Sequence, residues 1–278
     1  MAETWAETEA TYASYLLTTG HSDQTTRSYV ANLRIFARFC ALRAIDPATA
    51  GRPVLEAYVT AEFTRISRNT VALRLACLRA FYGFCRDRLG RQDDPTRGLI
   101  VKREETAPRP PYTEADIAAL LAACRNARDR AMIIVALECG LRVSELVGLR
   151  AGDVDLARGL MLVRGKGAKQ RWVGLGPRPS AALRPFLCGS GGVLWRMKDG
   201  WPLTVRRAKR NMGEIARRAG VRAHWHRFRT TFAHRFIDAT RDADALQTIL
   251  GHVSADTTRR YTAFHAQERA LDAMRRLA

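Results

Sequence analysis

The chain has 278 residues, which is long enough for two modest domains that each bury a core of their own. Its 46 Lys and Arg residues outnumber 27 Asp and Glu residues, and the formal net charge of +19 favours a polyanion such as nucleic acid over a neutral metabolite as partner. The acidic, polar N-terminus and a longest aliphatic run of only residues 131–137 argue against a signal peptide and a membrane span, so we expect an intracellular, cytoplasmic protein.

Residues 1–100 are expected to form a helical domain. Apolar and aromatic side chains recur at helical spacing over residues 4–17, 22–40, 53–63 and 67–89. These four helices carry no evident catalytic constellation. The start of the fourth helix is a candidate DNA contact, because amide groups at a helix start favour phosphate. The candidate side chains there are Arg65, Arg68, Asn69, Thr70 and Arg74.

A linker is predicted over residues 101–111, where the sequence VKREETAPRPP is charged, then rich in proline, and without apolar periodicity. The charge differs on its two sides. Residues 1–111 hold 16 basic and 12 acidic side chains, net +4, whereas residues 112–278 hold 30 and 15, net +15. The second domain, residues 112–278, therefore carries most of the positive charge.

The second domain is predicted to be mainly helical, with one small β-hairpin. A capping pattern begins a helix at Thr113, and a nearly all-apolar helix that should be buried follows. The β-rich text LMLVRGKGAKQRWVGL fits two short strands joined at Gly165 to Lys169. The expected helices cover residues 113–124, 129–138, 143–149, 180–187, 204–219 and 266–277.

The six cysteines have no C-x-x-C spacing and are scattered through apolar helical patterns, which indicates free thiols. No metal ligand set is expected from them, and no other cofactor is indicated.

The stretch from residue 226 to 261 gathers groups that can break a phosphodiester bond. It holds a His-x-x-Arg pair, His226 and Arg229, then a Leu-Gly-His corner ending at His252, then Tyr261. Together they offer a nucleophilic oxygen, a cationic donor for phosphate oxygens and titratable groups that move protons. Apart from Tyr112, Tyr261 is the only tyrosine of the second domain, which weakens a shared aromatic packing role for it.

Four ordered motifs carry a family resemblance: GLRVSEL (140–146), GKGAKQR (165–171), HRFRTTFAH (226–234) and LGHVSADTTRRY (250–261). With them the chain resembles tyrosine recombinases of the phage integrase and Xer type over nearly its whole length. The resemblance implies two domains that clamp duplex DNA: a helical, SAM-like core-binding domain and a mixed α/β catalytic domain.

The resemblance also implies catalytic roles. Tyr261 would be the nucleophile, forming a 3′-phosphotyrosyl link and releasing a 5′-hydroxyl. Arg142 and Arg229 would grip the nonbridging oxygens, since a planar guanidinium matches phosphate better than an ammonium does. Glu145, three residues after Arg142 on the same helical face, either holds the Arg142 guanidinium in place or forms a plain helix ion pair, and the two interpretations are compatible.

Lys166 is expected at the hairpin tip, as the general acid that protonates the leaving 5′-oxygen. Lys169 is its competitor for that role, and Lys169 and Arg171 are also candidate DNA contacts. His226 would bind phosphate or assist proton transfer from Tyr261, and His252 would add a further donor.

Two positions depart from the family pattern, because Trp225 replaces the usual Pro before the His-x-x-Arg pair and Thr230 replaces the usual His after it. After Tyr261 only 17 residues remain, enough for one helix. Its stripe of Leu271, Met274 and Leu277 would either dock on a neighbouring protomer or pack within its own chain.

We therefore expect a site-specific DNA recombinase that uses neither metal nor nucleotide. The resemblance implies a homotetramer on two DNA duplexes that exchanges strands through a Holliday junction. The motif departures slightly favour a short integrase of a phage or mobile element over a chromosomal Xer-type enzyme that resolves dimers. Rival hypotheses are a topoisomerase-like enzyme that religates the same strand and a catalytically silent DNA-binding regulator.

Overall fold

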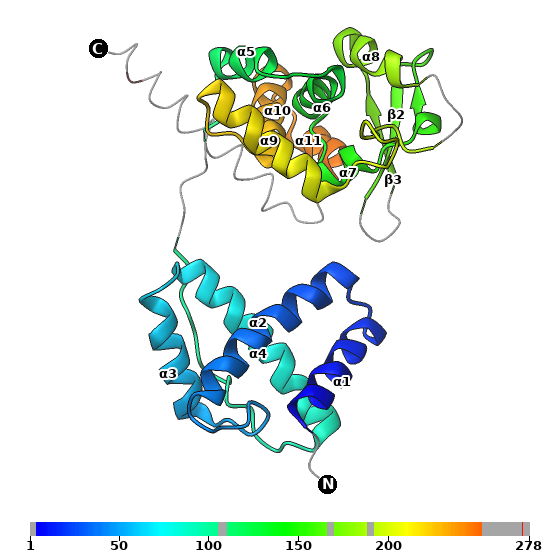
Figure 1. The fold of residues 1–278 in the computed structure, drawn as a ribbon. Helices are drawn as coiled ribbons and strands as arrows, with labels where there is room; N and C mark the ends of the chain where they lie inside the picture. Colours follow the sequence, from blue (N-terminus) through cyan, green and yellow to red (C-terminus); the bar gives the residue numbers. More distant parts are fainter. Residues whose placement is uncertain (1–3, 105–109, 166–169, 188–191, 252–273, 275–278) are drawn as a thin grey trace. The chain divides into compact units, whose positions relative to one another are not determined.

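The computed structural model describes residues 4–104, 110–165, 170–187, 192–251 and 274. The chain divides into two compact units, Met1–Ala107 and Pro108–Ala278, and the predicted linker contains the point of division. The fold is mainly helical with one small sheet, which confirms the predicted fold class (Figure 1). None of the described helices is both long and apolar enough to cross a membrane.

The first unit consists of four helices around one core, as the apolar spacing predicts. Side-chain oxygens of Thr4, Ser22 and Ser67 accept hydrogen bonds from amides of the first helical turns, which fixes where three of the helices begin. Aromatic rings dominate the core, for example Tyr12 against Phe81 with ring centroids 5.3 Å apart. The helices are α1 (Trp5–Thr18), α2 (Asp23–Ala41), α3 (Arg52–Phe63) and α4 (Arg68–Leu89).

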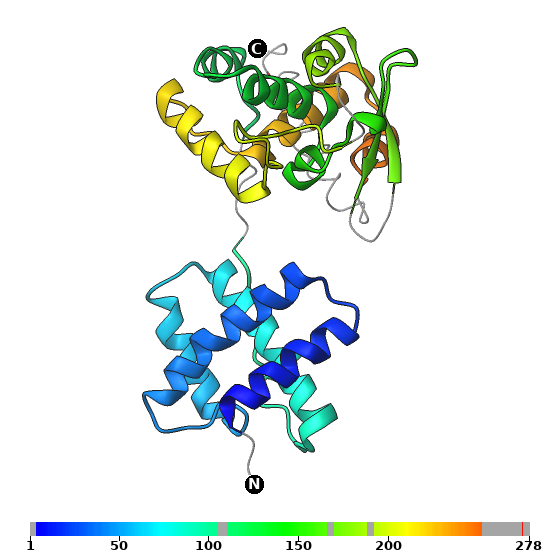
Figure 2. The same cartoon turned by 45° about the vertical axis from the view of Figure 1, so that its right-hand side comes forward.

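The second unit has helix α6 at its centre. α6 packs against α8 and α10, and it is buried along almost its whole length, as its apolar sequence predicts. The small sheet lies on one side of the unit and α5 on the other (Figures 1 and 2). The helices are α5 (Glu114–Ala122), α6 (Ala127–Cys139), α7 (Val143–Val147), α8 (Pro177–Leu183), α9 (Val205–Ala219), α10 (Trp225–Thr240) and α11 (Ala243–Leu250).

The sheet is antiparallel with the order β1-β2-β3. The predicted hairpin forms β2 (Leu160–Arg164) and β3 (Gln170–Gly174), and a third strand, β1 (Val154–Asp155), pairs with β2. That two-residue strand follows a short 3-10 helix, Ala151–Asp153, and is too short for alternation to reveal it in the sequence.

The register of the hairpin decides which side chains face the core. Val163 lies opposite Arg171, and Met161 lies opposite Val173. Because Met161, Val163 and Val173 are buried, Arg171 shares the inward face of the sheet. Trp172 lies on the outer face and is 55% exposed.

The helix expected over residues 180–187 begins earlier and ends sooner. α8 starts at Pro177, where a proline is tolerated because the first helical turn needs no amide donor. Pro185 then ends the regular helix, and Arg184–Phe186 continue as a 3-10 turn. Of the helix expected over residues 266–277, only Met274 is among the described residues, and it is exposed.

Replacing Gly140 with Ala should destabilise the second unit strongly. Gly140 ends α6 at φ +62°, and an added Cβ would lie 2.9 Å from Leu250 Cδ2 and closer still to the Phe232 ring. A left-handed backbone and a clash within a packed core together cost about 3 kcal/mol or more. The matched control is Gly220→Ala, since Gly220 has φ +65° but nothing within 4 Å of its added Cβ.

Urea unfolding of the two variants, followed through a probe in the second unit, measures this difference. Gly220→Ala is expected to lose only about 1 kcal/mol, the cost of the backbone conformation. Equal losses for the two variants would contradict the packing argument.

Candidate active site

The candidate site forms where α7, α10, α11 and β3 converge. Arg142 is the N-cap of α7 and lies two residues after Gly140, the corner at the end of α6. The Glu145 carboxylate accepts a hydrogen bond from the Arg142 amide at 2.8 Å and another from Arg142 Nη1 at 2.9 Å. The first contact caps α7 and the second pairs the Glu145 carboxylate with the Arg142 guanidinium, as their spacing predicts.

Arg229 joins the same corner to the end of α11. Its side chain is 1% exposed, and its guanidinium donates to the carbonyl oxygen of Gly140 at 2.8 Å and of Leu250 at 2.7 Å. Arg142 reaches the same last turn, with Nη1 3.4 Å from the Leu250 carbonyl oxygen and Nη2 3.3 Å from that of Gly251. The two arginines expected to grip phosphate therefore meet at the carboxyl end of α11, whose last carbonyl groups have no partner inside the helix.

A third arginine, Arg171, enters the site from β3. Its Nη1 and Nη2 donate to the two oxygens of Glu145 at 2.9 and 2.8 Å, and its Nε donates to the Ile249 carbonyl oxygen at 2.6 Å. Burial by itself raises the pKa of Glu145, but hydrogen bonds from the Arg171 side chain and the Arg142 amide outweigh it and lower that pKa below its usual value. Glu145 is therefore a buried carboxylate shared among arginines.

His226 lies on the first turn of α10 and keeps an exposed surface. Partial desolvation of the imidazole, followed by the positive charges of Arg229 and Arg142, lowers the pKa of His226 below its usual value. The imidazole is therefore mostly neutral at pH 7, and a neutral ring can accept a proton.

Four of the expected site residues lie outside the described part of the chain: Lys166, Lys169, His252 and Tyr261. The structure thus brings together Arg142, Glu145, His226 and Arg229, and it adds Arg171 to them. His252 is the next residue in sequence after Gly251, whose carbonyl oxygen Arg142 contacts.

The candidate DNA contacts of the first unit differ in how available they are. Arg65 and Arg68 are exposed, and Arg68 lies 3.5 Å from Glu104. Asn69 exchanges hydrogen bonds with the backbone of Glu104. Arg74 pairs with the buried Glu62, so its guanidinium is already engaged. The Thr70 amide donates a hydrogen bond to the Ser67 hydroxyl, which caps α4. DNA contact by these five residues stays a prediction.

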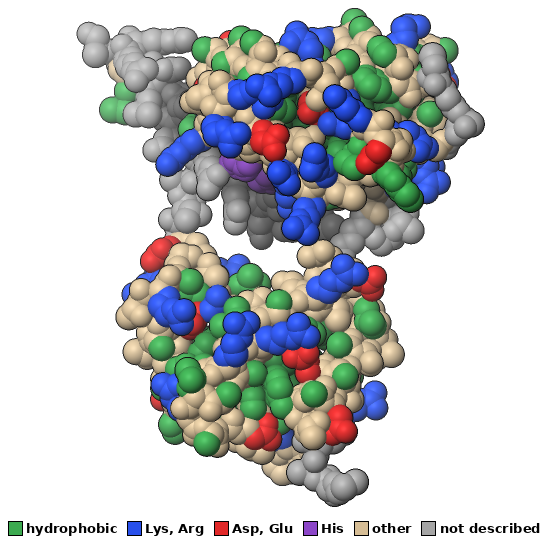
Figure 3. Space-filling model, in the orientation of Figure 1, with side chains coloured by type: hydrophobic (Ala, Val, Ile, Leu, Met, Phe, Trp, Pro, Cys, Tyr) green, Lys and Arg blue, Asp and Glu red, His purple; other side chains and the backbone are tan. Residues whose placement is uncertain are grey.

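A basic helix face was missed in the sequence. Ala208, Met212 and Ile215 are the buried positions of α9, and their helical spacing leaves the cations outside. Figure 3 shows Lys and Arg side chains gathered over this helix. The periodicity alone would have revealed the face. Its exposed cations are Arg206, Arg207, Lys209, Arg210, Arg217 and Arg218.

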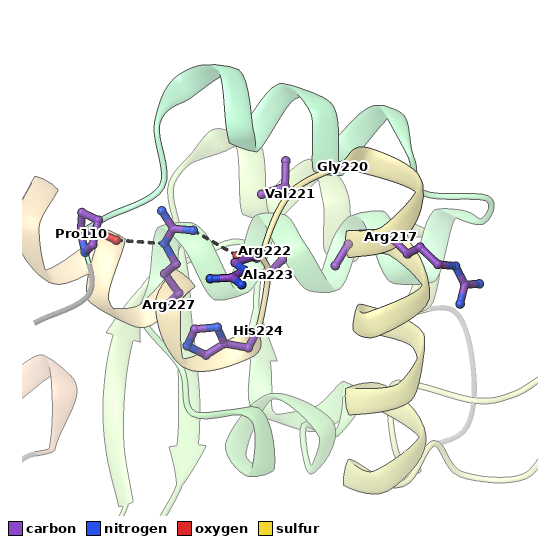
Figure 4. Close-up of a pocket in the computed structure, with 9 residues that line it drawn as sticks. Pro110, Arg217, Gly220, Val221, Arg222, Ala223, His224 and Arg227 are labelled. Carbon is purple, nitrogen blue, oxygen red and sulfur yellow. Dashed lines mark hydrogen bonds between the residues drawn. The ribbon is translucent and has the colours of Figure 1, made fainter. Parts of the chain in front are cut away.

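An open hollow of about 850 Å³ lies between the end of α9 and the start of α10, and its lining does not include Arg142, Arg171 or Arg229. Its lining includes Arg217, Arg222, His224 and Arg227 (Figure 4). Arg227 donates from Nε to the Pro110 carbonyl oxygen at 2.9 Å and from Nη1 to that of Arg222 at 3.1 Å. The hollow is therefore where the end of the predicted linker is fastened to α10.

The described residues hold no group of three or more His, Cys, Asp or Glu side chains that could bind a metal ion. The five described cysteines are free thiols, and four of them are buried. Burial raises the pKa of Cys139 to about 12, which leaves it as an unreactive thiol at neutral pH.

Two family models match the chain: the phage integrase family over residues 112–268, and the phage integrase N-terminal SAM-like domain over residues 10–88. The chain is 30% identical over 272 residues to the tyrosine recombinase XerC of Chromobacterium violaceum, covering 93% of this chain and 90% of that protein. It is 34% identical over 263 residues to XerC of Pelobacter propionicus, covering 87% and 85%. The Tn1549 transposon integrase in complex with transposon right end DNA has a similar fold, with a TM-score of 0.74 at 20% identity, covering 97% of this chain and 99% of that one.

Proposed function

The chain belongs to the phage integrase family and is a tyrosine recombinase, an enzyme that cleaves and rejoins DNA, and we propose that it acts as a Xer-type recombinase at a chromosomal site. The observation that carries this proposal is the alignment with XerC proteins across nearly the whole chain. The alignment with the Chromobacterium violaceum protein covers 93% of this chain, so it includes both domains and the linker between them.

The motif departures at Trp225 and Thr230 favoured a short integrase in the sequence, and the XerC relatives favour the alternative. Trp225 is buried and its ring nitrogen donates to the Ala208 carbonyl oxygen at 3.0 Å, so it packs α10 against α9. Because Trp225 has this packing role, its departure from the family pattern does not indicate which kind of DNA site the enzyme uses. The likeness to the Tn1549 integrase is one of fold and does not favour either role.

Within this function, Tyr261 is the proposed nucleophile. Its oxygen attacks phosphorus, the bond from phosphorus to the 5′-oxygen breaks, and the 3′ end stays on the tyrosine. Lys166 gives a proton to the leaving 5′-oxygen, and neutral His226 takes up the phenol proton. A 5′-hydroxyl of the partner strand then attacks the phosphotyrosine and releases Tyr261, so bond energy is conserved without a nucleotide.

Arg142 and Arg229 are proposed to bind the nonbridging oxygens, where charge grows as the pentacoordinate phosphorus forms. The described geometry supports this, since both guanidinium groups converge within hydrogen-bonding distance of one carbonyl oxygen, that of Leu250. His252 is proposed as a further donor. Because the donors are held in place before DNA binds, little reorganisation is needed at the moment of reaction.

Binding to duplex DNA is proposed for both units. The basic face of α9 and the exposed Arg65 and Arg68 supply phosphate contacts, and these contacts make binding weaken steeply with salt. Strand exchange between two duplexes requires four active sites, so we propose a homotetramer on DNA. Exchange of the tail helix between protomers stays part of this proposal.

Trapping the covalent intermediate in the source organism tests the Xer assignment. Cells that express the chain are lysed in denaturant, and the DNA covalently attached to the protein is sequenced. A single short chromosomal site that is present in cells lacking mobile elements is the expected result. A plasmid with two directly repeated copies of that site should then resolve into two circles.

Each other outcome overturns a specific part of the proposal. Attached DNA from the ends of a mobile element would make the chain an integrase. Relaxation of the plasmid without resolution would indicate a topoisomerase-like enzyme. Binding to DNA without any covalent attachment would indicate a regulator.

A further inference from the structure

Arg171 occupies a position where the sheet would normally bury an apolar side chain. It shares the inward face with Met161, Val163 and Val173, and its side chain is only 13% exposed. A cation on that face is costly unless it is paired and hydrogen-bonded. Arg171 meets both conditions, through Glu145 and the Ile249 carbonyl oxygen. Its partners lie 26 and 78 residues away, so the side chain ties β3 to two other elements.

The contact between Arg171 and Glu145 is a bidentate pair, with both distances below 3.0 Å. This arrangement is the strongest that an arginine and a carboxylate form. The Glu145 side chain is 3% exposed and is also approached by Arg229 Nη1, which lies 3.9 Å from it. Three arginines therefore surround one carboxylate, and Arg171 makes the bidentate contact.

The end of α11 is shaped to admit this side chain. Gly251 follows the helix at φ +61°, and a Cβ placed there would lie 3.3 Å from both Cδ and Nη1 of Arg171. The carbonyl oxygens of the last turn are shared among the arginines, with Ile249 bound by Arg171 and Leu250 by Arg229. Arg171 thus secures the point at which the chain leaves α11 toward His252 and Tyr261.

We propose that Arg171 is a positioning residue for DNA cleavage, which neutralises Glu145 and fixes the last turn of α11 so that Arg142 and Arg229 keep their geometry toward the phosphate. The proposal rests on the phosphate-binding roles assigned above to those two arginines. Without Arg171 the buried carboxylate would have to be neutralised by Arg142 and Arg229 themselves, which would draw their guanidinium groups away from the DNA. This role is proposed in place of the DNA contact expected for Arg171 from the sequence, because all three guanidinium nitrogens of Arg171 donate to Glu145 or to the Ile249 carbonyl oxygen.

The test compares Arg171→Gln with a matched control, Arg164→Gln. Arg164 lies on the neighbouring strand β2 and pairs with Asp153, another carboxylate that is 3% exposed. Among the described residues, its side chain has no hydrogen bond or ion pair with Arg142, Glu145, His226 or Arg229. Two quantities are measured on a nicked duplex that carries the trapped site: the single-turnover rate of covalent adduct formation at saturating protein, and the Kd at several salt concentrations.

Arg171→Gln is expected to slow adduct formation about 100-fold, the usual effect of misplacing catalytic groups by about 1 Å. Its Kd and its salt dependence should match those of the wild type. Arg164→Gln should react at the wild-type rate. Arg171→Lys should fall between, since an ammonium keeps the charge but cannot form the bidentate pair.

A pH profile separates positioning from a purely structural role. Once Arg171 is gone, Glu145 loses the two Arg171 hydrogen bonds that help to hold its pKa down, so Glu145 takes up a proton more readily. A protonated Glu145 no longer draws on Arg142 and Arg229, so the adduct rate of Arg171→Gln, relative to the wild type at the same pH, should recover as the pH is lowered. Adding Glu145→Gln to Arg171→Gln should remove that additional pH dependence.

The outcomes separate a failure of the positioning role of Arg171 from a failure of the proposed recombinase function. If the wild type forms no adduct, the proposed function fails and the inference with it. If the wild type reacts and Arg171→Gln reacts as fast, only the inference is overturned. Weaker binding with a smaller salt dependence, at an unchanged adduct rate, would restore Arg171 as a DNA contact. Should Arg171→Gln not fold, the same comparison is made with Arg171→Lys.

Discussion

Replacing Tyr261 with Phe is expected to abolish the covalent protein–DNA adduct. The change removes one oxygen atom and keeps the ring, so packing of the side chain is preserved while the nucleophile is lost. Removal of a nucleophile that forms a covalent intermediate lowers the rate by roughly 10⁴-fold or more. A suicide duplex with a nick near the cleavage position accumulates the adduct with the wild-type protein, and denaturing electrophoresis detects it.

The other tyrosine of residues 112–278 provides the matched control. The Tyr112 hydroxyl accepts a hydrogen bond from the His224 amide at 2.9 Å and donates one to the His224 carbonyl oxygen at 3.3 Å. Tyr112→Phe should therefore lose about 2 kcal/mol of stability, the worth of two hydrogen bonds, and still form the adduct at a rate close to that of the wild type. An adduct that persists in Tyr261→Phe would assign the nucleophile to another residue.

The sequence predicted those parts of the site that depend on local spacing. Arg142 and Glu145 are three residues apart on one short helix, and their contact follows from that spacing alone. The first unit was predicted for the same kind of reason, since Ser22 and Ser67 mark helix starts and the apolar positions recur at helical spacing. Four motifs in order then predicted the family.

Contacts between distant elements could not be read in this way. Alternation in β3 puts Arg171 and Val173 on one face and Trp172 on the other, but the local sequence does not say which face is buried. The register with β2 and the buried Glu145 determine that the face with Arg171 is the inward one, and neither is visible in the local sequence. Burial of Arg229 is a similar case, because its partners Gly140 and Leu250 lie 89 and 21 residues away.

Replacing Arg229 with Gln should damage both stability and chemistry. The side chain is 1% exposed, and the change removes the donors to the carbonyl oxygens of Gly140 and Leu250. It also takes away a positive charge that lies 3.9 Å from the buried Glu145. Breaking a buried charge pair from one side costs about 3 kcal/mol or more. Loss of one preorganised donor to the transition state slows cleavage by about 10²- to 10³-fold.

Arg229→Lys separates these two effects. An ammonium keeps the charge near Glu145, so part of the stability should return. It cannot present two parallel N–H groups to the phosphate, so the adduct rate should remain about 10²-fold below that of the wild type. Urea unfolding and single-turnover adduct formation, measured on the same two variants, give the stability and the rate.

Arg227→Gln is the control on the same helix. Arg227 is also largely buried and donates to carbonyl oxygens, but its acceptors are Pro110, Pro111 and Arg222. Its loss should lower stability and leave the adduct rate within a few-fold of the wild type, because the hydrogen bonds it makes hold the linker end. If Arg227→Gln and Arg229→Gln slow cleavage equally, the rate follows the stability of α10, and the phosphate-binding role of Arg229 is wrong. If Arg229→Lys regains the full rate, a point charge suffices and the guanidinium geometry has no part in catalysis.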